Sequence, residues 1–258
     1  MSERRVNVEQ DASVRNSSSE ESRAIRTIKI QTEELGFQTN EAIKMLRANI
    51  QFSGYGMKAI AMTSCHSNEG KSFVSFELAK SLAELGERTL YLDCDIRNSV
   101  AQARLGVTEK LPGLSDFLVG KAQIGDILCK TDVPHLHMIF AGSLSPNPAE
   151  LLSEDLFERL CDALKKNYDY IIMDTTPLGL VIDAAIIAKQ CDGTIMVIKA
   201  GDTDRKQAQQ VKARLEAANV RILGVVLNEA GGGHSGYGYG GYGEYGYGEK
   251  ASGKKKKR

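Results

Sequence analysis

The sequence predicts a single α/β domain, built on a mostly parallel sheet with helices on both faces and flanked by disordered segments at both ends. Three observations predict it. Apolar strands alternate with helices between about residues 38 and 230. Most of the strands are continuous apolar runs, which suit a sheet buried on both faces. A Gly-Lys-Ser segment at 70–72 follows one such strand and opens a helix, so a ligand is expected at the carboxyl ends of the strands.

The elements can be justified in order along the chain. A cap at Thr39 or Asn40 and the helical spacing of Ile43, Leu46 and Ile50 predict a helix that ends near residue 52. Apolar runs then predict strands over 57–64, 88–95, 136–142, 169–176, 193–200 and 221–228. Between them, helices are expected over 71–86, 113–120, 124–130, 147–167, 183–191 and 203–219.

The two ends differ in composition from this domain. Residues 1–37 are polar, lack periodicity and contain no apolar stretch typical of a signal peptide, so we expect a flexible N-terminal segment. Residues 231–258 are a Gly/Tyr-rich tail with a basic end. Zero formal net charge gives no general attraction to nucleic acid, and five scattered cysteines without a CxxC pair favour reduced thiols in the cytosol.

The stretch MTSCHSNEGKSF at 62–73 indicates a phosphate-binding loop of the P-loop NTPase type. Backbone N–H groups and a helix N-terminus would cradle ATP, Lys71 would reach its outer phosphates, and Ser72 would bind Mg²⁺. The full pattern wants a glycine where Cys65 stands. The alternative is an ordinary helix N-terminus that contains Gly-Lys-Ser by chance. The candidate nucleotide contacts are Ser67, Asn68, Glu69, Gly70, Lys71, Ser72 and Phe73.

Acidic residues end two of the predicted strands. YLDCDIR carries Asp93, Asp95 and Arg97, and YIIMDTTP carries Asp174. Carboxylates at the carboxyl ends of strands beside a phosphate loop are well placed to hold Mg²⁺. Each aspartate alone is also a common strand-end cap. The three together in this order favour a catalytic site.

These stretches together resemble the bacterial tyrosine kinases of capsule and exopolysaccharide synthesis, in the Gram-positive type whose cytoplasmic kinase is separate from its transmembrane activator. TSCHSNEGKS resembles the modified Walker A motif of that family, LDCDIR its Walker A′ motif, and IIMDTTP its Walker B motif. GLSDFLVG and AGSLSPNPAELL resemble stretches between them. The resemblance covers about residues 38–230, and the tyrosine-rich tail completes it.

The resemblance implies an ATP-dependent protein-tyrosine autokinase. It assigns Lys71 to the β- and γ-phosphates, and Ser72, Asp95 and Asp174 to Mg²⁺. Asp93 would accept or orient the proton of the tyrosine hydroxyl. Two further residues complete the assignment: Arg97 would act beside these carboxylates, while Asn228 would contact adenine or simply end its strand in a turn.

The tail is the expected substrate. Five of the nine tyrosines lie in it, at Tyr237, Tyr239, Tyr242, Tyr245 and Tyr247. Flexible Gly-rich sequence gives them reach into the active site of a second copy, where tethering raises their effective concentration. Taken alone, the tail also suits a low-complexity linker. The final KKKKR suits either a solvated end or attraction to an anionic membrane surface.

The resemblance also implies partners. Glu41, Lys44 and Arg47 match the E-x-x-R-x-x-R helix through which the family forms ring-like homo-oligomers such as octamers, although Lys44 replaces an arginine. The alternative is that these three charged residues only form a solvent-exposed face of the helix. We expect a transmembrane activator or polysaccharide co-polymerase, a cognate tyrosine phosphatase, and a cytoplasmic location at the inner face of the plasma membrane.

Two rival functions share these features. A partitioning or cell-division ATPase switch has the same fold, but its signature lysine and two glycines correspond here to His66, Ser67 and Asn68. A weakly catalytic nucleotide-binding scaffold of the polysaccharide machinery is the second rival. The complete set of lysine, serine and aspartates argues against a loss of chemistry.

Overall fold

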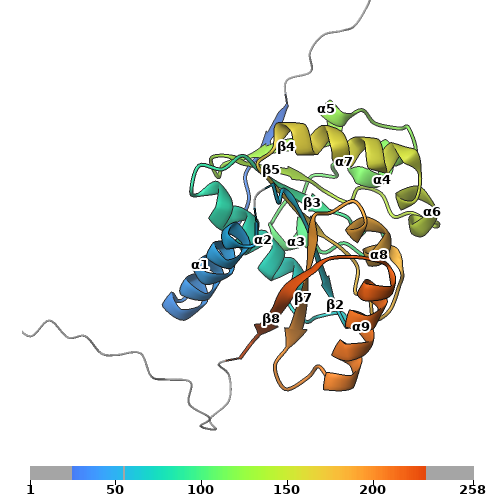
Figure 1. Cartoon of the computed structure of the whole chain (residues 1–258). Helices are drawn as coiled ribbons and strands as arrows, with labels where there is room; N and C mark the ends of the chain where they lie inside the picture. Colours follow the sequence, from blue (N-terminus) through green and yellow to red (C-terminus); the bar gives the residue numbers. More distant parts are fainter. Residues whose placement is uncertain (1–24, 55, 231–258) are drawn as a thin grey trace, which may run out of the picture.

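The computed structural model describes residues 25–54 and 56–230 (Figure 1). In these residues the chain forms one eight-stranded sheet with the order β1-β4-β5-β3-β6-β2-β7-β8. The strands are β1 (Arg26–Ile28), β2 (Ala59–Ser64), β3 (Thr89–Asp93), β4 (Leu128–Thr131), β5 (Leu136–Ile139), β6 (Tyr170–Asp174), β7 (Gly193–Lys199) and β8 (Ile222–Asn228).

The sheet is parallel at every pairing except β4 with β5, which is antiparallel. The predicted mostly parallel α/β sheet is therefore confirmed. Its central register decides where the acidic residues lie. Asp93 at the end of β3 pairs with Asp174 at the end of β6, and Met62 of β2 flanks Asp174 on the other side. The predicted acidic strand ends thus meet at one edge of the sheet.

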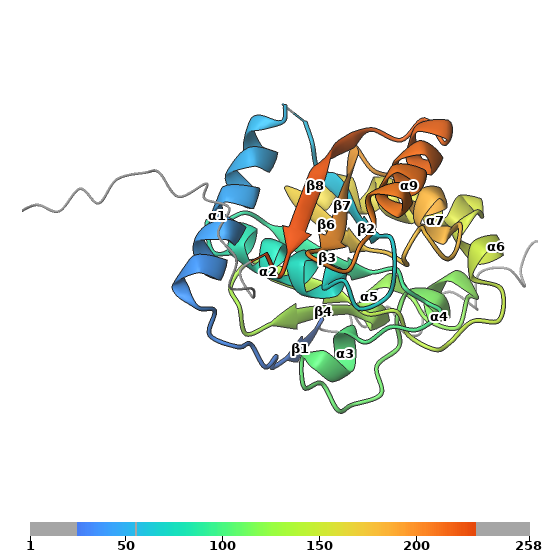
Figure 2. The same cartoon turned by 90° about the horizontal axis from the view of Figure 1, so that it is seen from below.

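Helices cover both faces of the sheet, as Figure 2 shows. One face carries α1 and α2, which pack on each other, and most of the other helices that cover the sheet lie on the opposite face. The helices are α1 (Phe37–Phe52), α2 (Lys71–Ala83), α3 (Ala101–Arg104), α4 (Leu114–Leu118), α5 (Ile124–Ile127), α6 (Pro148–Leu152), α7 (Asp155–Asn167), α8 (Asp183–Ala188) and α9 (Arg205–Ala217).

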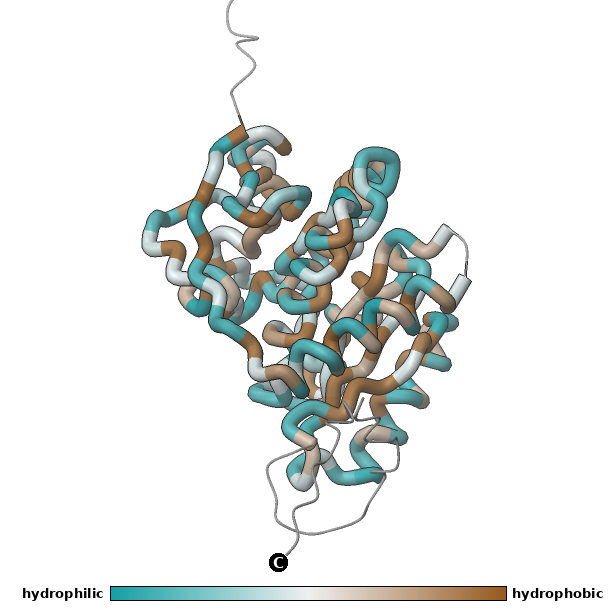
Figure 3. The backbone as a smooth tube through the Cα atoms, turned by 90° about the vertical axis from the view of Figure 1, so that its left-hand side faces the viewer, coloured by the Kyte–Doolittle hydropathy of each residue, from teal (hydrophilic) through white to brown (hydrophobic). Residues whose placement is uncertain are grey.

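Alternation along the central strands divides the core into two layers. Tyr91 of β3 packs toward α2, against Phe76, whereas Leu90 and Leu92 point to the opposite face and pack around Phe157 of α7. These side chains are almost completely buried. Helix α7 is amphipathic by contrast, because it buries Phe157, Leu160, Cys161 and Leu164 on one face, and Figure 3 shows hydrophilic and hydrophobic residues mixed along the backbone. The sheet is therefore rigid, and it holds the side chains at the ends of its strands in fixed positions.

The structure departs from the predicted elements near the far edge of the sheet. Within the segment expected to be flexible, Arg26–Ile28 forms the edge strand β1, because Ile28 and Ile30 are buried there and the Ile30 N–H donates to Asp132 Oδ1 at 3.1 Å. The helix expected over 124–130 ends at residue 127. Cys129 instead lies in β4, opposite Met138 of β5, so the helical prediction was wrong for 128–130.

Two helices also differ in extent. The long helix predicted over 147–167 is two helices, because Glu154 adopts an extended backbone with a ψ of 150° and separates α6 from α7. Helix α1 begins at Phe37, after Gly36, so the expected caps at Thr39 and Asn40 lie inside its first turn.

Every helix in the described part of the chain is too short or too polar to cross a lipid bilayer.

Candidate active site

The phosphate loop joins β2 to α2 and depends on a glycine. Gly70 has a φ of +82°, a left-handed conformation that favours glycine. A Cβ added there would lie 1.9 Å from Asn228 Nδ2, so a side chain at this position would collide with the end of β8. Cys65, which stands where the full pattern has a glycine, is not among the residues with positive φ. The loop therefore has no conformational need for glycine at that position.

Glu69 organises the loop from inside. Its carboxylate accepts hydrogen bonds from the N–H groups of Cys65 at 2.6 Å and His66 at 2.8 Å, and from the hydroxyl of Thr203 before α9. The residue is 2% exposed. Its side chain is thus committed to contacts within the protein and is not available to a nucleotide. Sequence reasoning missed Thr203, which lies 134 residues from Glu69 in the chain.

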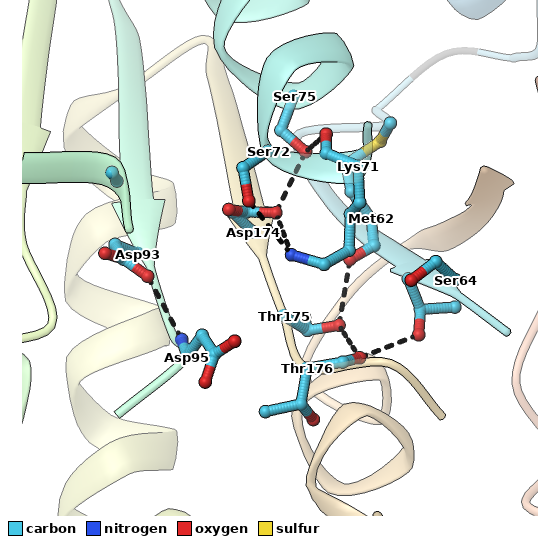
Figure 4. Close-up of polar contacts among 12 residues, drawn as sticks. Met62, Ser64, Lys71, Ser72, Ser75, Asp93, Asp95, Asp174, Thr175 and Thr176 are labelled. Atoms are coloured by element: carbon cyan, nitrogen blue, oxygen red, sulfur yellow. Dashed lines mark hydrogen bonds and ion pairs between the residues drawn. The ribbon is translucent and has the colours of Figure 1, made fainter. Parts of the chain in front are cut away.

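Lys71 and Asp174 form a buried ion pair at the centre of the site (Figure 4). Lys71 Nζ lies 2.5 Å from Asp174 Oδ1 and 3.3 Å from the hydroxyl oxygen of Ser72. Ser75 Oγ is 3.2 Å from the same carboxylate oxygen, and the Tyr91 hydroxyl donates to Asp174 Oδ2 at 2.9 Å. Burial, followed by the charge of Asp174, raises the pKa of Tyr91 well above 10, which keeps this phenol a donor.

Asp93 and Asp95 have different surroundings. Asp93 is 1% exposed. It accepts the N–H of Asp95 at 3.1 Å through Oδ1 and the hydroxyl of Ser99 through Oδ2. Burial first, and then the negative charge of Asp174, raise the pKa of Asp93 to about 7. Asp95 is partly exposed and accepts the N–H of Asn98 at 3.0 Å. One carboxylate thus faces the interior, and the other faces the open side of the loop.

A pocket of about 150 Å³ opens over the phosphate loop. It brings together the predicted loop residues and Asp95, whereas Asp93, Asp174 and Phe73 are not among its lining residues. Sequence reasoning missed Arg104 of α3, whose guanidinium carbon lies 4.8 Å from the centre of the Phe73 ring. The lining residues are Ser64, His66, Ser67, Asn68, Glu69, Gly70, Lys71, Ser72, Asp95, Asn98, Val100, Arg104 and Pro177.

Two other predicted residues make structural contacts. Arg97 does not line the pocket but forms a two-pronged ion pair with Asp183 of α8, at 2.5 Å from Nε and 2.9 Å from Nη2. Asn228 Nδ2 donates to the Glu69 carbonyl at 3.1 Å. The end of β8 therefore lies against the phosphate loop, only two residues before the described part of the chain stops. The five tail tyrosines lie outside the described residues.

The predicted oligomerisation residues lie on α1. Lys44 pairs with Glu41 at 2.8 Å, and both side chains are about half exposed. Arg47 points inward instead and donates from Nη1 to the carbonyl and the hydroxyl of Ser81 on α2, each at 2.9 Å. Arg47 therefore holds α1 against α2 within the chain, whereas the Glu41–Lys44 pair lies at the surface.

The donor set fits a magnesium ion that arrives with a nucleotide. The residues at 25–54 and 56–230 contain no group of three or more His, Cys, Asp or Glu side chains that could hold a metal by themselves. Mg²⁺ prefers one or two carboxylates together with phosphates and water, which the Ser72 hydroxyl, Asp95 and Asp174 can complement. The buried hydroxyl of Thr176 has no partner in the described structure, leaving it for a water or ligand atom.

Known proteins are similar to this chain in both sequence and fold. The family described as "AAA domain" matches residues 57–219. Tyrosine-protein kinase CpsD of Streptococcus agalactiae serotype III is 44% identical over 192 residues, which cover 74% of this chain and 83% of that protein. The solved chimerical protein CapA2B2 has a TM-score of 0.72 at 28% identity and covers 77% of this chain and 91% of its own.

A third likeness concerns the fold alone. The septum site-determining protein MinD of Pyrococcus horikoshii, solved with Mg-ADP, has a TM-score of 0.59 at 24% identity and covers 69% of this chain and 72% of its own. It shows that the architecture is shared with nucleotide-binding proteins of another function. The 44% identity to CpsD over most of both chains decides between the tyrosine kinases and the septum site-determining protein. This chain belongs to the bacterial tyrosine-protein kinase family.

Proposed function

We propose that the chain is an ATP-dependent tyrosine autokinase that phosphorylates the tail tyrosines of a second copy and thereby controls capsular or exopolysaccharide synthesis. The observation that carries this proposal is the convergence of Lys71, Asp93, Asp95 and Asp174 beside the phosphate loop. The kinase relatives support the same chemistry. We infer ATP and Mg²⁺ as the cofactors from the loop and from its oxygen donors.

Each residue then has a definable task. Lys71 would leave Asp174 and neutralise charge on the outer phosphates, because a phosphate oxygen offers it the same kind of ionic hydrogen bond. Ser72, Asp95 and Asp174 would hold Mg²⁺ and its water shell, and the ion would supply charge neutralisation to the transferring phosphoryl group. Asp93 would accept the proton of the substrate tyrosine hydroxyl once the Ser99 hydroxyl no longer donates to Asp93 Oδ2. Asn228 remains the proposed adenine contact.

The proposed partners follow the same reasoning. A solved chimera named CapA2B2 supports an activator partner. We propose that this partner is a transmembrane protein that contributes a cytoplasmic segment. That partner would hold the kinase at the inner face of the plasma membrane. The exposed Glu41 and Lys44 support a ring-like homo-oligomer built through α1. A cognate tyrosine phosphatase would return the tail to its unphosphorylated state.

Incubation of the purified protein with Mg²⁺-ATP and the activator segment is expected to place phosphate on tyrosines at 237–247. Mass spectrometry of the tail measures this directly. A Lys71→Met variant is the matched control, because methionine keeps the length of the side chain but has no charge for the phosphates. Its tail should stay unmodified when it is incubated alone.

Two outcomes would contradict this function. Hydrolysis of ATP to ADP with an unmodified tail, even with activator present, would instead support an ATPase switch. A tail phosphorylated equally by wild type and Lys71→Met would indicate a contaminating kinase. Mixing Lys71→Met as substrate with a wild-type chain that lacks the tail tests the trans reaction, because phosphate on the variant then comes from the other copy.

Arg104 is expected to contribute to nucleotide binding. It lines the pocket, and it forms no ion pair within the described residues. Its charge is therefore available to a phosphate group. An Arg104→Ala variant should raise the KM for ATP by about tenfold, the equivalent of one charge-assisted hydrogen bond of about 1.5 kcal/mol.

The measurement is a titration of ATP in the phosphorylation assay at low and at moderate salt. Arg159→Ala provides a matched control, since Arg159 is an exposed arginine of α7 on the opposite face of the sheet. Equal KM values for Arg104→Ala and wild type would exclude a nucleotide contact for Arg104.

A further inference from the structure

Three side chains contact the Asp174 carboxylate, and the proposed mechanism removes one of them. Lys71 lies 2.5 Å from Oδ1, Ser75 lies 3.2 Å from the same oxygen, and Tyr91 donates to Oδ2 at 2.9 Å. Lys71 has to leave if it is to reach the phosphates. Asp174 then needs another partner that keeps it in place as its ionic partner departs.

The two remaining donors are unequal. Ser75 has a single hydroxyl proton, and its shorter contact is with the Lys71 carbonyl at 2.8 Å rather than with Asp174 at 3.2 Å. That proton is therefore used mainly to close the first turn of α2. The Tyr91 hydroxyl contacts Asp174 at 2.9 Å and has no other hydrogen-bond partner in the described structure. Tyr91 is thus the donor committed to this carboxylate.

Tyr91 is also rigidly placed. It lies in β3, between β5 and β6, and is 0% exposed. Its ring packs edge-on against Phe76 of α2, with 6.1 Å between the ring centres and an interplanar angle of 74°. A phenol held by the sheet on one side and by α2 on the other cannot follow a moving carboxylate. It can instead define where that carboxylate stays.

We propose that Tyr91 is a positioning residue for Mg²⁺ binding, whose hydroxyl holds the Asp174 carboxylate in its metal-binding orientation after Lys71 has moved to the phosphates. This inference rests on the Mg²⁺-ATP site of the proposed function. It needs no change of charge at Tyr91 and no exposure of its ring. Tyr91 is therefore distinct in role from the tail tyrosines, which are substrates.

The test is the gain in ADP affinity that Mg²⁺ confers, measured by isothermal titration calorimetry on the full chain. A Tyr91→Phe variant keeps the ring and removes the hydroxyl. Its affinity for ADP without metal should match wild type, because Tyr91 does not line the pocket. The gain conferred by Mg²⁺ should fall at least about tenfold, the usual effect of losing an outer-shell partner of a metal ligand.

Tyr168→Phe is the matched control. It removes another buried phenol hydroxyl, which lies 2.7 Å from His137 Nδ1 at the opposite end of the sheet. A comparable loss of stability is expected from this change, but the gain from Mg²⁺ should equal that of wild type. A general softening of the core would affect both variants, whereas a positioning role affects only Tyr91→Phe.

Three results would overturn the proposal. The first is an unchanged Mg²⁺-dependent gain in Tyr91→Phe. The second comes from Ser75→Ala, which remains informative even when Tyr91→Phe fails to fold: a tenfold loss of the gain there would assign the anchoring to Ser75. A wild-type chain that gains no affinity from Mg²⁺ would overturn the metal site itself, and this inference with it.

Discussion

The kcat/KM for tail phosphorylation is expected to fall about tenfold for each pH unit below the pKa of Asp93, as for a reaction that needs one deprotonated base. Burial and the charge of Asp174 place that pKa at about 7 in the nucleotide-free chain. A protonated Asp93 cannot accept the phenol proton, so activity is present above this pH and lost as the pH falls through it. A pH series of initial rates measures the profile.

The same reasoning separates kcat from kcat/KM. The profile of kcat/KM reports the free enzyme, whereas that of kcat reports the complex with bound substrate. Positive charge from bound metal favours the ionised carboxylate, so the break in kcat should lie at a lower pH. Two profiles that break at the same pH would show that bound nucleotide does not change the surroundings of Asp93.

An Asp93→Asn variant is the control for this assignment. Loss of a general base costs about 10²- to 10⁴-fold in rate, and the remaining activity should no longer depend on pH in this range. The variant should still bind Mg²⁺-ADP, since Asp93 does not line the pocket. If Asp93→Asn keeps the wild-type profile, the titrating group lies elsewhere and Asp93 serves to hold the Asp95 backbone and Ser99.

The framework of this site follows from short-range sequence patterns. Continuous apolar runs indicate where β2, β3 and β6 end, and parallel pairing brings those ends together. Lys71, Asp95 and Asp174 could therefore be named as candidates before their contacts were known. The predicted family is shown by its relatives. The local sequence pattern predicted the edge of the sheet less well. There β4 is extended because it pairs with β5, and not because its own residues favour a strand.

The contacts that sequence reasoning missed join residues that lie far apart in the chain. Tyr91 is separated by 83 residues from Asp174, and Arg97 by 86 residues from Asp183. Tyr91 looks like one more buried residue of an apolar strand, because nothing local distinguishes a hydroxyl that packs from one that donates to a carboxylate. Only the register of β3 beside β6 reveals its partner.

Replacement of Arg97 by alanine is expected to lower the free energy of unfolding by about 3 kcal/mol, because it strands a buried carboxylate without its partner. The Asp183 side chain is 1% exposed and receives both prongs of the guanidinium, whereas the Arg97 side chain is 37% exposed. That exposure puts the expected loss at the low end of the range for broken buried pairs. Urea unfolding of Arg97→Ala beside wild type measures it.

A second substitution reveals the cause. Arg97→Ala combined with Asp183→Asn removes the stranded charge and should recover about half of the lost stability, since the desolvation of an unpaired ion is the largest part of the cost. Recovery of kinase activity along with stability would make Arg97 a clamp between the Walker A′ segment and α8. Recovered stability with activity still absent would instead show that Arg97 acts on the reacting groups, as the family resemblance implies.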